Sequence, residues 1–123
     1  MSKIRYNNNH NYNITTFEER VYDLCSKVPR GKVTTYKILA EALGTEAYRA
    51  VGNAMNKNPY GILSCKGKAM VPCHRVVDSK GHLRGFAHGL KKKAELLEKE
   101  GIKVKDNKIV DFEKVLEKVL FRF

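Results

Sequence analysis

The tightest constraint on the fold is a pair of short amphipathic segments that meet at Gly44 and Thr45. Thr34 or Thr35 can cap the first segment as a helix, and Gly44 can end it in a left-handed conformation that glycine adopts without strain. The second segment starts at Thr45 and runs to Lys57. Their apolar positions, at helical spacing, are Tyr36, Leu39, Ala40 and Leu43, then Ala47, Ala50, Val51, Ala54 and Met55. Two short helices joined by a Gly-Thr turn predict a helix-turn-helix with the second as recognition helix, although an ordinary helical hairpin fits too.

Further helices are predicted on both sides of this pair. Thr16 can cap a first helix with Glu19 at its third position, and that helix would end near residues 29–31. A later helix would run from Leu90 to Glu100, where Gly101 ends it. The pattern therefore predicts a mainly α fold.

The remaining segments are shorter and contain turn signals. Glycines interrupt residues 59–89, which predicts loops and a short hairpin that would form the small β wing of a winged helix-turn-helix-like domain. Apolar residues alternate around Asp106-Asn107 within residues 102–110, which predicts a second hairpin, and residues 112–120 have the spacing of a last amphipathic helix.

The length predicts one domain, because 123 residues would leave two separate cores marginal. Residues 1–14 are rich in asparagine and poor in aliphatic side chains, so we expect a flexible arm followed by a domain over residues 15–123. No apolar run is long enough to span a membrane or to form a signal-peptide core. We therefore expect a soluble monomer in the cytoplasm, or in the nucleus of a eukaryote.

The charge points to a polyanionic partner. Lys and Arg number 24 against 13 Asp and Glu, which gives a net charge of +11 at pH 7. Such an excess suits nucleic acid, although a basic protein without that partner would have the same composition. The three cysteines, with no framework-like spacing, predict reduced thiols and not a disulfide scaffold.

The three thiols differ in their neighbours. Cys25 lies on the apolar face of the first predicted helix, which indicates a buried, inert thiol. Cys65 lies in a loop beside lysines but has no base next to it in the sequence. Cys73 follows Pro72 and precedes His74 and Arg75, so a base and a permanent cation are available to favour its thiolate.

The run Pro72-Cys73-His74-Arg75-Val76 resembles the acceptor site of the methylated-DNA-protein-cysteine methyltransferases, or alkylguanine-DNA alkyltransferases. Before it, "GKVTTYKILAEALGTEAYRAVGNAMNKNP" is similar to the family's helix-turn-helix, and after it "GFAHGLKKKAELLEKEG" is similar to its closing segment. The resemblance covers about residues 17–101, which leaves residues 102–123 as a C-terminal hairpin and helix extension.

The resemblance implies a catalytic set. Cys73 would be the nucleophile that keeps the alkyl group, His74 would accept its proton through a water, and Glu100 would orient the histidine. Tyr36 would donate to the flipped guanine as it leaves, and Asn58 would brace the site. The implied reaction is a single-turnover transfer that needs no cofactor and no metal.

The resemblance also implies double-stranded DNA with an alkylated guanine as the partner, bound through the minor groove. Arg49 would fill the space left by the extruded nucleotide, since the alkylated oxygen cannot meet a sulfur inside the duplex. The DNA-contacting residues would be Arg49, Thr35, Ala47, Tyr48, Gly52, Asn53 and Arg75. The substrate pocket would be formed by Met55, Pro72, Val76, Phe86 and Ala87.

The chain departs from the family pattern at three places. Residues 60–70 form a longer stretch than the family's short apolar link, and Cys65 lies within it. Phe86-Ala87 stands where the family often has Tyr-Ser, which removes two hydroxyls near the substrate. Only the Asn-rich arm precedes Phe17 in the sequence, so we expect no counterpart of the separate N-terminal domain common in the family.

Two other readings remain. A non-catalytic winged-helix protein could recognise alkylated or bent DNA, although relatives of that kind replace the acceptor cysteine that this chain keeps. A zinc site could use Cys65, Cys73, His74 and His82 or His88, but these spacings match no standard zinc finger.

Overall fold

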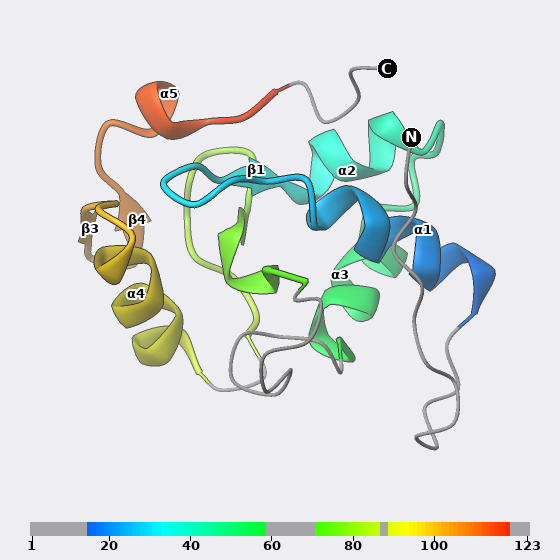
Figure 1. Cartoon of the computed structure of the whole chain (residues 1–123), viewed down its shortest axis with the longest axis horizontal. Coiled ribbons are helices and arrows are strands. Elements are labelled where there is room, and N and C mark those ends of the chain that lie inside the picture. Colours follow the sequence, from blue (N-terminus) through cyan, green and yellow to red (C-terminus); the bar gives the residue numbers. More distant parts are fainter. Residues whose placement is uncertain (1–14, 59–70, 87–88, 119–123) are drawn as a thin grey trace.

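The computed structural model describes residues 15–58, 71–86 and 89–118 (Figure 1). Its helices are α1 (Thr16–Cys25), α2 (Tyr36–Ala42), α3 (Tyr48–Asn56), the short 3-10 helix η2 (Cys73–Arg75), α4 (Leu90–Lys99) and α5 (Phe112–Val115). Its strands are β1 (Thr34–Thr35), β2 (Val76–Val77), β3 (Val104–Lys105) and β4 (Lys108–Ile109). The mainly α prediction is confirmed. The predicted arm, the 60–70 insertion with Cys65, Ala87 and His88 lie outside the described residues.

Helix α1 begins one residue earlier than predicted. Thr15, not Thr16, is the cap: its hydroxyl accepts from the Glu18 amide at 3.1 Å, and the Glu18 carboxylate accepts from the Thr15 amide at 3.0 Å. The spacing allows both pairs, Thr15 with Glu18 and Thr16 with Glu19. An ion pair of 2.6 Å between Glu18 and Lys57 at the end of α3 favours the earlier one.

The predicted helix-turn-helix is present, but its second helix starts late. Thr35 caps α2 by accepting from the Ile38 amide at 3.0 Å, and Gly44 follows α2 with φ of +74°. Helix α3 begins at Tyr48, because the Thr45 hydroxyl accepts from the Ala47 amide and so closes a turn before the helix. Ala47 is therefore the residue before the helix and not part of it.

The chain continues through the Cys73 motif into a small parallel sheet. β1 pairs with β2 in the register Thr34 to Val76 and Thr35 to Val77. Within residues 71–86 of the predicted wing, the one described strand is β2, which pairs with β1, and residues 59–70 lie outside the described residues. The described antiparallel hairpin is β3 with β4, turning at Asp106 and Asn107, as the alternating pattern there predicts.

The last predicted helix, over residues 112–120, is shorter than predicted within the described residues. α5 is one turn, and Leu116 then continues in extended backbone beside β1 (Figure 1). The Val33 amide donates to the Val115 carbonyl at 2.8 Å, and the Glu117 amide donates to the Val33 carbonyl at 2.7 Å. These hydrogen bonds to the edge of β1 outweigh the helical spacing of the apolar residues, as tertiary context often does.

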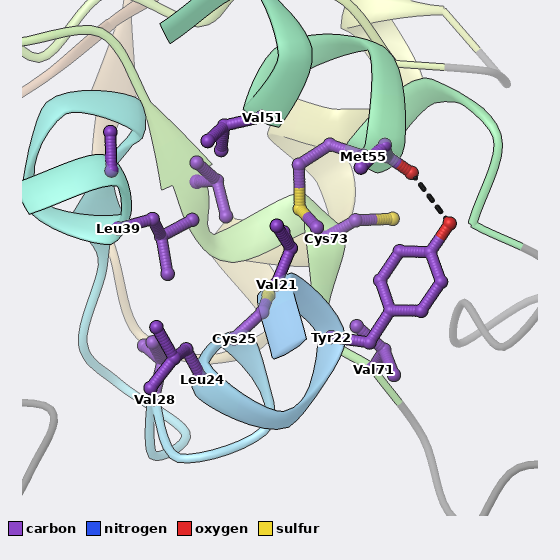
Figure 2. Close-up of a cluster of buried hydrophobic side chains, with 13 residues drawn as sticks. Val21, Tyr22, Leu24, Cys25, Val28, Leu39, Val51, Met55, Val71 and Cys73 are labelled. Carbon is purple, nitrogen blue, oxygen red and sulfur yellow. Dashed lines mark hydrogen bonds between the residues drawn. The ribbon is translucent and has the colours of Figure 1, made fainter. Parts of the chain in front are cut away.

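Two apolar clusters form the core. The first lies among α1, α2, α3 and the segment that carries Cys73 (Figure 2). The second includes Val33 and Val77 of the sheet region, Leu97 of α4, and Ile102 and Ile109 beyond it. The Cys73 motif runs from the first cluster into the second, so its side chains meet residues from both halves of the chain.

Candidate active site

Cys73 opens η2 at the border of the first cluster (Figure 2). Its side chain is only 8% exposed, so burial raises the pKa of the thiol. A hydrogen bond from Asn58, the charge of Lys93 and the amides of Cys73 and His74 act in the opposite direction and favour the thiolate. Cys25 is completely buried in the same cluster, which confirms its prediction as a core thiol.

Asn58 links the end of α3 to the Cys73 segment. Its side-chain amide donates to the Val71 carbonyl at 2.9 Å and also contributes a hydrogen bond to the Cys73 sulfur. Asn58 therefore lies beside Cys73, although residues 59–70 separate the two segments in the sequence.

His74 is fully buried, and its ring meets the carboxylate of Glu100. Its Nε2 lies 3.0 Å from Oε2 of Glu100. Burial alone would raise the pKa of Glu100, but hydrogen bonds from His74 and Arg75 outweigh it and lower that pKa to about 2. An ionised carboxylate can only accept, so Nε2 is the donor, and the tautomer that donates from Nε2 has Nδ1 as its acceptor. Within the described ranges, Nδ1 has no hydrogen-bond partner.

Arg75 is buried on the same carboxylate. Its Nε donates to Oε1 of Glu100 at 2.8 Å, its Nη2 donates to Oε2 at 2.6 Å, and its Nη1 donates to the Val28 carbonyl at 2.9 Å. All three guanidinium nitrogens therefore bind inside the protein. This placement leaves Arg75 little surface for the predicted DNA contact, because the guanidinium fork matches a carboxylate that the fold brings to it.

Lys93 is the cation near Cys73, and sequence reasoning missed it. It comes from α4, is fully buried, and lies with its Nζ 5.9 Å from the ring centroid of Tyr36. Burial lowers the pKa of Lys93 to about 8, against the opposing charges of Cys73, Cys25 and Asp78. One signal was available: Lys93 stands three residues after Leu90 and four before Leu97, on the apolar face of α4.

Tyr36 and Lys93 share one acceptor in the loop before α4. The Tyr36 hydroxyl donates to the Arg84 carbonyl at 3.0 Å, and Nζ of Lys93 donates to the same oxygen at 2.6 Å. Burial, followed by the nearby charge of Cys73, raises the pKa of Tyr36 well above its usual range. Tyr36 therefore stays protonated as a donor at neutral pH.

The residues predicted to face DNA divide into two groups. Arg49 and Asn53 are exposed on α3, Tyr48 is 41% exposed, and Ala47 is exposed just before the helix. Open space surrounds the position where a side chain on Gly52 would begin. Thr35 differs: it is buried and its hydroxyl is used as the cap of α2, which leaves it little surface for the predicted DNA contact.

The predicted pocket residues lie around Cys73. Met55 and Val76 are buried in the first cluster with Cys73, Pro72 is buried before it, and Phe86 packs against the cluster while partly exposed. Ala87 lies outside the described residues. The structure therefore brings four of the five predicted pocket residues to one region.

Among the described residues, no group of three or more His, Cys, Asp or Glu side chains could hold a metal ion. The described helices include none that is long and apolar enough to cross a membrane.

The sequence matches known proteins over the region that carries this site. Residues 16–102 match the family described as 6-O-methylguanine DNA methyltransferase, DNA binding domain. The chain is 46% identical over 93 residues to a methylated-DNA–protein-cysteine methyltransferase of Metallosphaera sedula, and this covers 76% of the chain and 54% of the relative. A Thermococcus gammatolerans protein of the same description is 48% identical over 91 residues, which covers 73% of the chain and 47% of the relative.

Solved structures show the same likeness. An O6-methylguanine-DNA methyltransferase from Pyrococcus kodakaraensis has a TM-score of 0.61 at 47% identity and covers 72% of this chain and 48% of its own. Mycobacterium tuberculosis OGT in complex with DNA has a TM-score of 0.63 at 38% identity, covering 71% of this chain and 49% of its own. S. pombe Atl1, in complex with damaged DNA containing O6-carboxymethylguanine, has a TM-score of 0.68 at 29% identity. The match covers 84% of this chain and 95% of the Atl1 chain.

The chain spans about half the length of the curated relatives it matches. Within that span, the match includes α1 to α4 and every described residue of the Cys73, His74 and Glu100 constellation. The chain therefore belongs to the 6-O-methylguanine DNA methyltransferase family, in its DNA-binding domain.

Proposed function

We propose that this protein repairs duplex DNA by moving an alkyl group from O6 of guanine to the sulfur of Cys73, once per molecule. The observation that carries the proposal is the constellation at Cys73: a thiol near Asn58 and Lys93, followed by a histidine whose Nε2 is fixed by Glu100. The solved structures similar to this chain include two in complex with DNA.

The chemistry begins at His74. Because Nε2 donates to Glu100, the free lone pair is on Nδ1, which would take the thiol proton through a water. The positive charge that forms on the ring is stabilised by Glu100, whose low pKa keeps it ionised. This division of roles among nucleophile, base and orienting carboxylate follows the general logic of a catalytic triad.

The thiolate would then attack the alkyl carbon as the bond from that carbon to O6 breaks. Lys93 stabilises the thiolate electrostatically, since its charge and that of Cys73 act on one another in a buried site. Tyr36 would leave the Arg84 carbonyl and donate a hydrogen bond to the departing guanine anion, which would then take up the proton released from the Cys73 thiol. The thioether on Cys73 has no leaving group for a second transfer, so turnover stops at one.

The DNA would be held by the exposed side of α3. Tyr48, Arg49 and Asn53 face outward there, and the open surface at Gly52 suits close approach of a groove. The base must leave the stack to reach Cys73, and Arg49, which is exposed and makes no hydrogen bond or ion pair within the described part of the chain, is free to replace it. Double-stranded DNA containing alkylated guanine is therefore the proposed partner.

The test is intact-protein mass spectrometry after incubation with a duplex that carries one O6-methylguanine. We expect the mass to rise by one CH2 group, with the methyl group mapped to Cys73 and no rise in Cys73→Ala. Cys25→Ala is the matched control and should react as the wild type does, since Cys25 is fully buried. DNA binding without any mass gain would overturn the transfer and favour a non-catalytic reader of damaged DNA.

A further inference from the structure

We propose that Arg84 is a DNA-phosphate contact that seats the nucleotide whose base enters the site. The inference rests on the proposed function and adds a residue to it. Arg84 precedes Gly85 in the loop between β2 and α4, and its side chain is 66% exposed.

Asp78 holds the Arg84 side chain in one direction. Oδ1 of Asp78 accepts from the amides of Lys80 and His82, at 2.9 and 2.8 Å, so the carboxylate is fixed to its own turn. Oδ2 accepts from Nε of Arg84 at 3.1 Å and lies 3.4 Å from Nδ1 of His82. The carboxylate is therefore an anchor with four contacts, and Arg84 is oriented before any ligand arrives.

The outward edge of the guanidinium is the part available for binding. Only Nε of Arg84 makes a hydrogen bond in the described ranges, which leaves the fork formed by Nη1 and Nη2 without a hydrogen-bond partner there. A guanidinium presents parallel N–H donors in a rigid fork that matches two phosphate oxygens. An arginine held through Nε alone is therefore prepared for a phosphate.

The backbone of Arg84 lies at the group that would meet the base. Its carbonyl accepts from the Tyr36 hydroxyl and from Nζ of Lys93. In guanine, N3 stands opposite C6 in the six-membered ring and is bonded to the carbon that carries the glycosidic nitrogen. We place O6 at Cys73 and N3, on the opposite side of the ring, at the Tyr36 hydroxyl. The edge of the base near Tyr36 is then the edge next to the sugar, so the sugar-phosphate would lie near Arg84.

The alternative is a simple surface ion pair. An exposed Arg–Asp pair contributes little to stability, and Arg84 and Asp78 would then have no part in DNA binding. The two possibilities differ in whether loss of the Arg84 side chain weakens DNA binding. The carbonyl that binds Tyr36 and Lys93 belongs to the backbone of Arg84. A side-chain substitution therefore leaves that contact in place.

The experiment compares Arg84→Ala, Arg84→Lys and the wild type on two substrates. One is a duplex with O6-methylguanine, measured over a range of salt concentrations, and the other is the free base O6-benzylguanine, which has no phosphate. For Arg84→Ala we expect the duplex rate to fall about tenfold at low salt and the slope of log K against log salt to shrink by about 1. Arg84→Lys should restore part of the duplex rate, because it keeps the charge but not the fork.

The free base separates this inference from the proposed function. We expect Arg84→Ala to react with it as the wild type does, since no phosphate is present. The control is Arg30→Ala, which removes the same charge at the other end of α4, where Arg30 donates to the Lys99 carbonyl at 2.8 Å. An equal loss in Arg30→Ala, an equal loss on the free base, or no loss on the duplex would overturn the role of Arg84. Absence of transfer by the wild type on both substrates would instead overturn the proposed function.

Discussion

Arg75 holds both carboxylate oxygens of Glu100, with Nε 2.8 Å from Oε1 and Nη2 2.6 Å from Oε2. Oε2 also lies 3.0 Å from Nε2 of His74. One carboxylate thus binds two consecutive side chains of the Cys73 motif. The grip of Arg75 fixes the plane of the carboxylate, and the carboxylate in turn fixes the histidine ring, so Arg75 acts as a positioning residue.

Removing the arginine should destabilise the fold and slow the reaction. In Arg75→Met, Glu100 stays buried without its main partner. We expect the free energy of unfolding, measured by denaturant titration, to fall by about 3–5 kcal/mol. The double variant Arg75→Met/Glu100→Met leaves no unpaired charge and should recover part of that loss. Equal stability of the single variant and the wild type would contradict a buried pair.

Acid should reveal the same carboxylate. The pKa of Glu100 is lowered from 4.5 to about 2 in the folded protein, so the unfolded state binds the proton first as pH falls. Its stabilising contribution is complete above about pH 4.5 and is lost as pH falls toward 2. Urea titrations between pH 7 and pH 3 should show a steeper acid loss for the wild type than for Glu100→Gln. Parallel curves would show that Glu100 is not the group responsible.

Lys93→Met should separate reactivity from stability. Without the buried cation the pKa of the Cys73 thiol rises further, so iodoacetamide should label Cys73 more slowly at pH 8, and alkyl transfer should slow with it. The control is Lys92→Met, which removes a partly exposed cation from the position of α4 just before Lys93. Unchanged labelling in Lys93→Met would mean that its charge does not reach the thiol.

Lys93 also predicts a rise of stability with pH. Its folded pKa of about 8 lies below the ordinary 10.5, so between these values the unfolded state binds more protons than the folded state. The free energy of unfolding attributable to Lys93 therefore increases from about pH 8 to pH 10.5. Titrations with urea across this range should show the increase in the wild type and not in Lys93→Met.

Two glycines should respond oppositely to alanine. Gly81 has φ of +86°, and a Cβ there would lie 3.0 Å from the Phe112 ring, so Gly81→Ala should lower stability by about 1–3 kcal/mol. Gly52 lies inside α3 with open space around it, so Gly52→Ala should raise stability by up to about 1 kcal/mol. If the face of α3 approaches a groove, the same change should weaken DNA binding. Thermal unfolding and a duplex-binding titration check both.

Local patterns predicted most of the helices correctly. A cap at Thr34 or Thr35, helix ends at Gly44 and Gly101, and the apolar face of α4 depend on neighbours within a few residues, so the sequence predicts them. Where two local structures are both compatible with the sequence, the sequence does not decide between them. The choice of Thr15 over Thr16 is favoured by the ion pair of Glu18 with Lys57, just after α3, and Leu116 leaves its helix for the edge of β1.

The sequence by itself determined which side chains form the site. Cys73 and His74 are adjacent in the chain, and Glu100 and Tyr36 were assigned by their resemblance to the family motif. Tertiary structure alone decided how these groups are partnered. It turned Arg75 inward to Glu100 and brought the Lys93 ammonium under Tyr36. The reason is physical: both partners come from α4 or its end, and only burial removes the water that would otherwise satisfy these charges.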